Sequence, residues 1–210
     1  MGGGVRQDKR RRKAKITQFD IIEGALKMNR EDALKLVKQH VKTKNLVKHM
    51  LATEAVMASL ARRLGEDEEE WALAGLLHDI DYDKTSDDPD RHSLVGGELL
   101  EELGVNEDIV YAVKAHNECH GLPRESLLDK ALWAVDPLTG LLVAAALIHP
   151  EKKLGALDVG FAINRFKEAS FARGANRDQM KSCLELGLAL EEFIEIGLEA
   201  MQSISSELGL

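Results

Sequence analysis

The spacing of hydrophobic residues predicts helices along almost the whole chain from Asn29 onward. The pattern is clearest in residues 46 to 60, where the apolar side chains fall on one face of a helix: Leu46, Met50, Val56, Met57 and Leu60. No segment alternates β-branched with polar residues, and the sequence has only 4 prolines, so it predicts no strand. We therefore expect an all-α fold, a single-domain helical bundle.

Caps and helix breakers divide this pattern into separate helices. Asn29 is a good N-cap for the first helix, and Gly65 is a good terminator for the second. The expected helices cover residues 30–41, 43–64, 66–79, 89–103, 106–120, 124–136, 138–148, 157–172, 177–186 and 190–208.

Two of these boundaries bear on chemistry. A polar loop follows the third helix, and we expect the next helix to open at Pro89 or Asp90, with His92 at the start of its apolar face. Pro137 predicts the start of a new helix, because proline favours the first turn and lacks an N–H group. Asp136 would then be the N-cap of that helix.

Six polar side chains fall on helix faces that should otherwise be apolar: His49, His78, Asp79, His92, His116 and Asp136. The pair His78-Asp79 closes the uncharged run from Trp71 to Leu77, which predicts a buried helix. A buried carboxylate needs a partner, and a metal cation suits adjacent His and Asp side chains. One such residue alone is more often a hydrogen-bonded core histidine or a capping carboxylate. Six of them on consecutive helices favour a metal site.

The order of these residues resembles the signature of the HD-domain superfamily of metal-dependent phosphohydrolases, an all-helical family. Three segments within about residues 40 to 145 are similar to blocks of that family: Leu77-His78-Asp79-Ile80-Asp81, His92-Ser93-Leu94-Val95-Gly96 and His116-Asn117-Glu118-Cys119-His120-Gly121. The resemblance implies two ligand sets that share one carboxylate: His49, His78, Asp79 and Asp136 for one metal, and Asp79, His92 and His116 for a second. Such ligands suit one or two divalent transition metal ions, with iron or manganese favoured and zinc, nickel, cobalt or magnesium possible.

The resemblance also implies an activity. Metal-activated water would hydrolyse a phosphate ester or anhydride of a nucleotide or another small phosphorylated metabolite, with Asp79 among the catalytic residues. In relatives, a lysine or an acid shortly after the HD pair touches phosphate or positions water. This makes Lys84 a candidate for binding the phosphate charge and Asp83 a candidate for proton transfer. The roles of His120 and of the basic stretch 165–181 stay open, because that stretch could lend cations to an anionic substrate or form a solvated face.

Two other functions stay open at this level. One is a di-iron oxygenase, because a few relatives with this ligand set activate O₂. The other is a non-catalytic nucleotide sensor that keeps the metals for structure. An O₂-dependent product would favour the first, and tight nucleotide binding without turnover would favour the second.

Charge divides the chain into two parts. Residues 5–15 hold seven Lys or Arg and one Asp, so the remaining chain carries 21 basic against 35 acidic side chains. We expect residues 1–27 to be a basic, flexible N-terminal extension and residues 28–210 to be the HD-type hydrolase domain. An acidic domain argues against nucleic acid as its main ligand. No apolar stretch looks long enough to span a bilayer and no secretory signal is recognisable, so we expect a cytoplasmic protein without a membrane partner. The oligomeric state stays open.

Overall fold

The computed structural model describes residues 28–210, and this part of the chain contains helices and no strand. The all-α prediction is confirmed, whereas the predicted extension at residues 1–27 lies outside the described residues. The α-helices are α1 Arg30–His40, α2 Lys44–Leu64, α3 Glu68–Leu77, α4 Tyr82–Thr85, α5 Leu94–Glu102, α6 Glu107–Ala115, α7 Leu127–Ile148, α8 Val159–Lys167, α9 Arg177–Lys181, α10 Leu190–Ser203 and α11 Ser205–Leu208. Short 3-10 helices cover Glu118–His120, Leu154–Ala156 and Ser182–Leu186.

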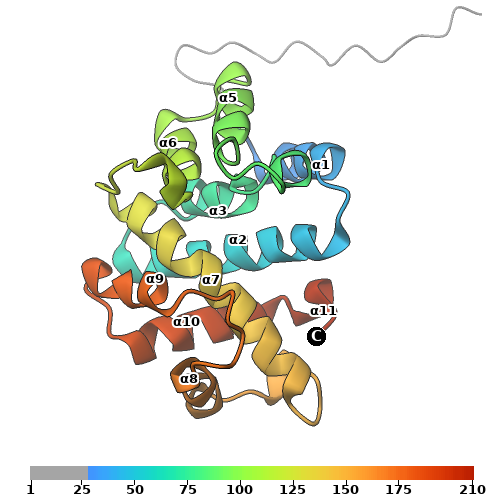
Figure 1. Cartoon of the computed structure of the whole chain (residues 1–210), viewed down its shortest axis with the longest axis vertical. Coiled ribbons are helices and arrows are strands. Elements are labelled where there is room, and N and C mark those ends of the chain that lie inside the picture. The colour runs from blue at the N-terminus through green and yellow to red at the C-terminus, as the bar shows by residue number, and fades with distance from the viewer. Residues whose placement is uncertain (1–27) are drawn as a thin grey trace, which may run out of the picture.

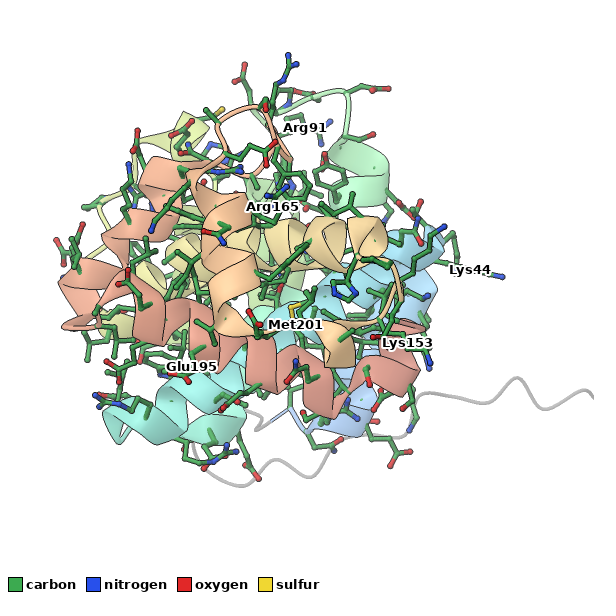
Figure 2. The ribbon with its side chains drawn as sticks, turned by 90° about the horizontal axis from the view of Figure 1, so that it is seen from below. Lys44, Arg91, Lys153, Arg165, Glu195 and Met201 are labelled. Atoms are coloured by element: carbon green, nitrogen blue, oxygen red, sulfur yellow. The ribbon has the colours of Figure 1, made fainter. Side chains whose placement is uncertain are left out.

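Helix α2 lies at the centre of the bundle and packs against α3 on one side and α10 on the other (Figure 1). Four of the five residues of its predicted apolar face are fully buried, Met50, Val56, Met57 and Leu60, whereas Leu46 is partly buried and lines a pocket. Each such side chain stabilises the fold by about 1.5–3 kcal/mol through burial. In Figure 2, the charged side chains of Lys44 and Glu195 project outward, whereas Met201 lies inside, between α7 and α10.

Helices α2 and α3 approach each other at Gly75. A Cβ atom on Gly75 would lie 2.8 Å from the carbonyl oxygen of Thr53 and 2.9 Å from the backbone nitrogen of Glu54. These are backbone atoms, which cannot turn aside as a flexible side chain would. The two backbones can therefore pack at this distance only because residue 75 has no side chain.

Helix α7 continues through Pro137, and the predicted break there is wrong. Proline has no N–H group, so the carbonyl oxygen of Trp133, one turn earlier, loses its helical partner. The side-chain amide of Gln179 in α9 donates a hydrogen bond of 2.8 Å to this carbonyl. The helix thus continues without a break, because Leu138, Leu141 and Leu142 are buried in the core and the free carbonyl of Trp133 is satisfied by Gln179.

Several further boundaries differ from the prediction. Helix α8 ends at Lys167 rather than at residue 172, and the predicted polar loop contains the short helix α4. Helix α5 begins at Leu94, so His92 lies in the preceding turn, and α6 ends at Ala115, before His116. The expected helix at residues 177–186 changes from α to 3-10 geometry at Ser182.

The length and composition of α7 also match those of a membrane span, contrary to the expectation from sequence. However, 61% of the most apolar part of α7 is buried inside the fold.

Candidate metal centre

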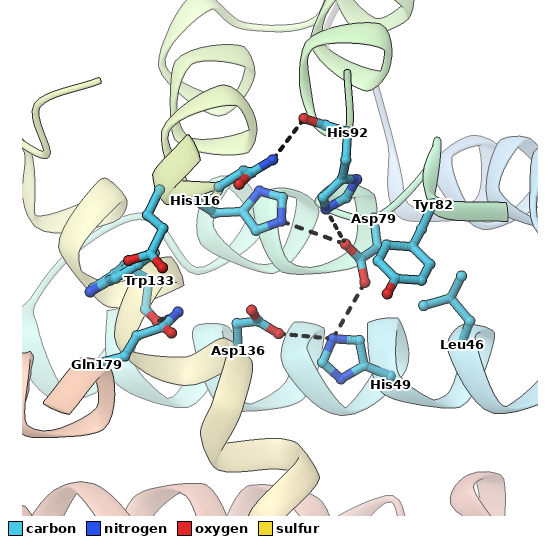
Figure 3. A pocket seen from close by; sticks show the side chains of 11 residues that line it. Leu46, His49, Asp79, Tyr82, His92, His116, Trp133, Asp136 and Gln179 are labelled. Atoms are coloured by element: carbon cyan, nitrogen blue, oxygen red, sulfur yellow. Dashed lines mark hydrogen bonds and ion pairs between the residues drawn. The ribbon is translucent and has the colours of Figure 1, made fainter. Parts of the chain in front are cut away.

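The structure brings all six predicted ligands together around one carboxylate, Asp79. Figure 3 shows these side chains except that of His78. His49 lies within α2, and Asp136 lies within α7. His78 and His116 each follow directly after the last residue of a helix, α3 and α6. Asp136 does not cap a helix, because α7 runs past it.

One side of the carboxylate faces what we call the first donor group, His49, His78 and Asp136. The Nε2 atom of His49 lies 3.1 Å from Nε2 of His78 and 3.1 Å from Oδ1 of Asp136. Oδ2 of Asp79 lies 3.4 Å from Nε2 of His78 and 3.6 Å from Nε2 of His49. Ligands bound about 2.1 Å from a shared metal lie roughly 3 to 3.5 Å apart, so these spacings fit a bound ion.

The other side of the carboxylate faces the second donor group, His92 and His116. Oδ1 of Asp79 lies 3.3 Å from Nε2 of His92 and 3.5 Å from Nε2 of His116. The two oxygens of Asp79 therefore face different imidazole pairs. This is the arrangement in which one carboxylate can bridge two metal ions.

Each imidazole is held by a hydrogen bond on its outer nitrogen. Nδ1 of His49 lies 2.9 Å from the Thr139 hydroxyl, and Nδ1 of His92 lies 3.0 Å from Oδ1 of Asp81. The other two rings donate to backbone carbonyls one turn earlier: His78 to Gly75 at 2.8 Å and His116 to Val113 at 2.6 Å. With every Nδ1 occupied as a donor, every Nε2 can offer its lone pair to the centre. Two such lone pairs 3.1 Å apart repel unless a cation lies beside them, so the donor set fits divalent metal.

Electrostatics couples these groups closely. Burial disfavours charge on His78, but Asp79 and Asp136 outweigh burial and raise the pKa of His78 to about 9. Burial also opposes charge on His92, yet hydrogen bonds to Asp79 and Asp81 raise the pKa of His92 to about 9. Burial alone would raise the pKa of Asp79, but the neighbouring imidazoles hold it well below its usual range. The carboxylates thus keep their negative charge, which a metal cation would neutralise as the protons leave.

The buried residue Asp81 supports the second donor group, although the sequence analysis gave it no role. Besides the ring of His92, it accepts 2.8 Å hydrogen bonds from the backbone N–H groups of Ser93 and Gly96. Ser93 has a left-handed backbone with φ of 70°, which is strained for a residue with a side chain. Asp81 thus caps α5 from outside and fixes the turn that carries His92. The recurrence of Asp two positions after Asp79 was the available signal.

His120 and Asn117 hold the same turn from the other side. Nε2 of His120 donates to the carbonyl oxygen of His92 at 2.7 Å, and the side-chain amide of Asn117 donates to that oxygen at 3.1 Å. His120 therefore positions the backbone of a predicted ligand.

Asp83 and Lys84 stand apart from the six ligands and do not line the central pocket. Asp83 accepts hydrogen bonds from the backbone N–H groups of Lys42 and Thr43, just before α2. Slight burial opposes its charge, but these hydrogen bonds lower the pKa of Asp83. The Nζ atom of Lys84 lies 3.3 Å from Nδ1 of His40. These contacts indicate a capping role for Asp83, and the catalytic roles of both residues stay predictions.

A pocket of about 460 Å³ opens over the centre. Aromatic, amide and acidic side chains surround the ligands in its wall: Tyr82, Trp133, Asn117, Gln179 and Glu118. The Arg124 guanidinium lies over the ring of Trp133, 4.0 Å from the ring centre. Neither Trp133 nor Gln179 belongs to a motif that would predict a place in the site, and only the fold brings α9 beside α7.

The chain is similar to a known family and to several known proteins. The HD domain family matches residues 46–152, a range that includes all six predicted ligands. Ribonuclease Y of Oleidesulfovibrio alaskensis is 33% identical over 98 residues, which cover 47% of this chain and 18% of the relative. The symmetrical bis(5'-nucleosyl)-tetraphosphatase of Halalkalibacterium halodurans is 31% identical over 132 residues, which cover 52% of this chain and 68% of the relative.

The two kinds of relative differ in how far the similarity extends. The chain spans about a fifth of the ribonuclease Y proteins that it matches, with 18% of the Oleidesulfovibrio alaskensis protein and 20% of the Lawsonia intracellularis protein covered. It spans about two thirds of the tetraphosphatase.

Proposed function

The chain belongs to the HD-domain family, and on that premise we propose that it is a metal-dependent phosphohydrolase acting on a nucleotide or a similar small phosphorylated molecule. The observation that carries the proposal is the position of Asp79, whose two oxygens face separate groups of imidazoles at 3.3 to 3.6 Å. Metals held there would supply Lewis-acid chemistry and a nucleophilic water at neutral pH.

The residues of this chain supply position and charge. Asp79 lies between the donor groups and holds them in one frame, while Thr139, Asp81 and two backbone carbonyls fix the imidazole rings. Asp136 adds a second carboxylate. Two negative charges are then available to balance the positive charge of metal bound beside the buried imidazoles. We infer iron or manganese, because imidazole and carboxylate donors with open positions suit these ions.

Two observations support a nucleotide-like substrate. Trp133 and Tyr82 in the pocket wall offer aromatic surfaces for a base, and Gln179 offers an amide. The tetraphosphatase among the relatives acts, by its name, on a nucleoside phosphate compound. We propose a small cytoplasmic substrate rather than a nucleic acid or a membrane, since the chain outside residues 5–15 carries 35 acidic against 21 basic side chains.

The test is metal content and hydrolysis measured together on the purified protein. The substrates are a nucleoside monophosphate, a nucleoside triphosphate, a dinucleoside tetraphosphate, an aryl phosphate and a short RNA, because ribonuclease Y proteins are among the relatives. We expect bound transition metal and hydrolysis of a small phosphate compound, with both lost in Asp79→Ala. The control is Asp87→Ala, which removes an exposed carboxylate in the loop before α5 and should change neither.

Five results would contradict the proposal or redirect it. Hydrolysis that persists in Asp79→Ala, or an unaltered parent without metal, would overturn it. Faster cleavage of RNA than of small substrates would replace the substrate class. An O₂-dependent product would indicate the di-iron oxygenase, and nucleotide binding without turnover would indicate the sensor.

A further inference from the structure

The loop between α8 and α9 is built around one guanidinium group. Arg177 donates hydrogen bonds of 2.6 to 3.4 Å to backbone carbonyl oxygens at both ends of the loop and along it: Arg165, Phe166, Glu168, Phe171, Ala172 and Ala175. Burial lowers the pKa of Arg177, and no carboxylate pairs with it among the described residues. Because these carbonyl groups all accept hydrogen bonds from one side chain, Arg177 fixes the path of the loop.

This fixed loop presents Arg173 without a partner. Ala172, the residue before it, has a left-handed backbone with φ of 43°, a strained conformation that the contacts of Arg177 help to maintain. Arg173 is exposed and makes no hydrogen bond or ion pair within residues 28–210. Its neighbours differ, since Arg165 pairs with Glu168 at 2.7 Å and Lys181 pairs with Asp178 at 2.9 Å.

Arg173 lies in the wall of a cavity of about 410 Å³ that adjoins the metal centre. His49, Asp136 and Gln179 line both this cavity and the central pocket. Apart from imidazoles, Arg173 is the one basic side chain in either wall within the described part of the chain. An anionic group that extends from the centre past Asp136 would therefore meet this guanidinium.

We propose that Arg173 binds a second phosphate group of the substrate, next to the phosphate that reacts at the centre. The substrate is then a phosphoanhydride, such as a nucleoside polyphosphate, rather than a monoester. A guanidinium suits this task because its planar N–H groups match two phosphate oxygens. The acidic chain needs such a cation, since metals that neutralise the first phosphate leave the charge of the second unpaired. The inference rests on the proposed function and adds the subsite that selects the substrate.

The test compares Arg173→Ala and Arg173→Lys with the unaltered protein on two substrates. For a nucleoside triphosphate, we expect KM to rise about tenfold to a hundredfold in Arg173→Ala, as for the loss of a charged hydrogen bond, with partial recovery in Arg173→Lys. For an aryl phosphate, kcat and KM should stay within about twofold, because no second phosphate reaches residue 173. Inorganic tripolyphosphate should inhibit the unaltered protein more strongly than Arg173→Ala.

The matched control is Lys181→Ala, which removes the same charge from the same stretch but lines neither cavity. It should leave both KM values and the inhibition by tripolyphosphate unchanged. Equal effects of Arg173→Ala on both substrates, or no effect on either, would overturn the subsite.

A separate outcome concerns the proposed function itself. If the unaltered protein hydrolyses no phosphate compound, the phosphohydrolase proposal fails. Calorimetric titration with tripolyphosphate then judges the subsite alone: weaker binding to Arg173→Ala supports it, and equal binding overturns it.

Discussion

The two donor groups that share Asp79 differ in what holds their side chains. In the first donor group, His49 and Asp136 lie inside the long helices α2 and α7, and His78 closes α3. Their backbone positions follow from helices packed in the core. In the second donor group, His92 lies in a turn that depends on polar side chains, namely Asp81, Asn117 and His120.

This contrast teaches that the two halves of one centre can have different rigidity. Packing of the core positions the first donor group, whereas His92 of the second donor group depends on a hydrogen-bonded turn with a strained Ser93. Pre-organised ligands lose less freedom on binding. The first metal should therefore bind more tightly than the second.

The largest expected effect separates the two groups by removing one histidine from each. We expect about two metals per chain in the unaltered protein, about one in His92→Ala and less than one in His49→Ala. The loss is greater in His49→Ala because the more rigid first donor group is expected to bind metal more tightly. Mass spectrometric metal analysis of the purified variants gives the three values. Equal losses in the two variants would mean that the second donor group is as rigid as the first.

A smaller effect comes from the groups that hold the rings. Thr139→Val removes the partner of His49, and Asp81→Asn weakens the partner of His92. Loss of such an outer contact lowers metal affinity by roughly tenfold to a hundredfold. Metal titration should show Thr139→Val weakening the tighter site and Asp81→Asn weakening the looser one. The assignment of the two groups is wrong if the effects are exchanged.

The smallest expected effect concerns stability alone. Asp83 bonds to backbone N–H groups before α2, and Asp83→Asn should lower the free energy of unfolding by about 0.5–1 kcal/mol at pH 7. Since the pKa of Asp83 is lowered in the folded state, its contribution is present above the ordinary carboxyl pKa. The contribution disappears as the pH falls through the lower folded value.

Urea unfolding of both proteins at several pH values measures this difference. Metal content should be unchanged in Asp83→Asn, because the Asp83 carboxylate contacts the backbone before α2 and neither donor group. A loss of turnover without a loss of stability would instead favour the catalytic role predicted for Asp83.

Much of the fold could be predicted from local patterns. The apolar face of α2 and the caps Asn29 and Gly65 are local signals, and the structure places them as expected. The six predicted ligands could be named because each is a polar residue on the apolar face of a predicted helix. The structure places His78, His92 and His116 just outside helices.

The remaining features depend on contacts between distant segments. Pro137 predicts a helix start on local evidence. In the structure α7 continues through Pro137, because it packs in the core and the amide of Gln179 satisfies the free carbonyl. His92 lies before α5 because Asp81 caps that helix from another element. Arg173 lies in the wall of the adjoining cavity because of a loop whose shape no short motif predicts.

The close approach at Gly75 has a consequence for how this centre can change over time. The same residue lets α2 and α3 touch and accepts the Nδ1 hydrogen of His78, so the gap between His49 and His78 is set by a crossing of two backbones. Substitution of Gly75 would widen that gap while all six predicted ligands stayed unchanged in the sequence. A descendant of this protein could lose the capacity to bind metal with all six predicted ligands intact, so a complete motif in a related sequence is no guarantee of a working centre.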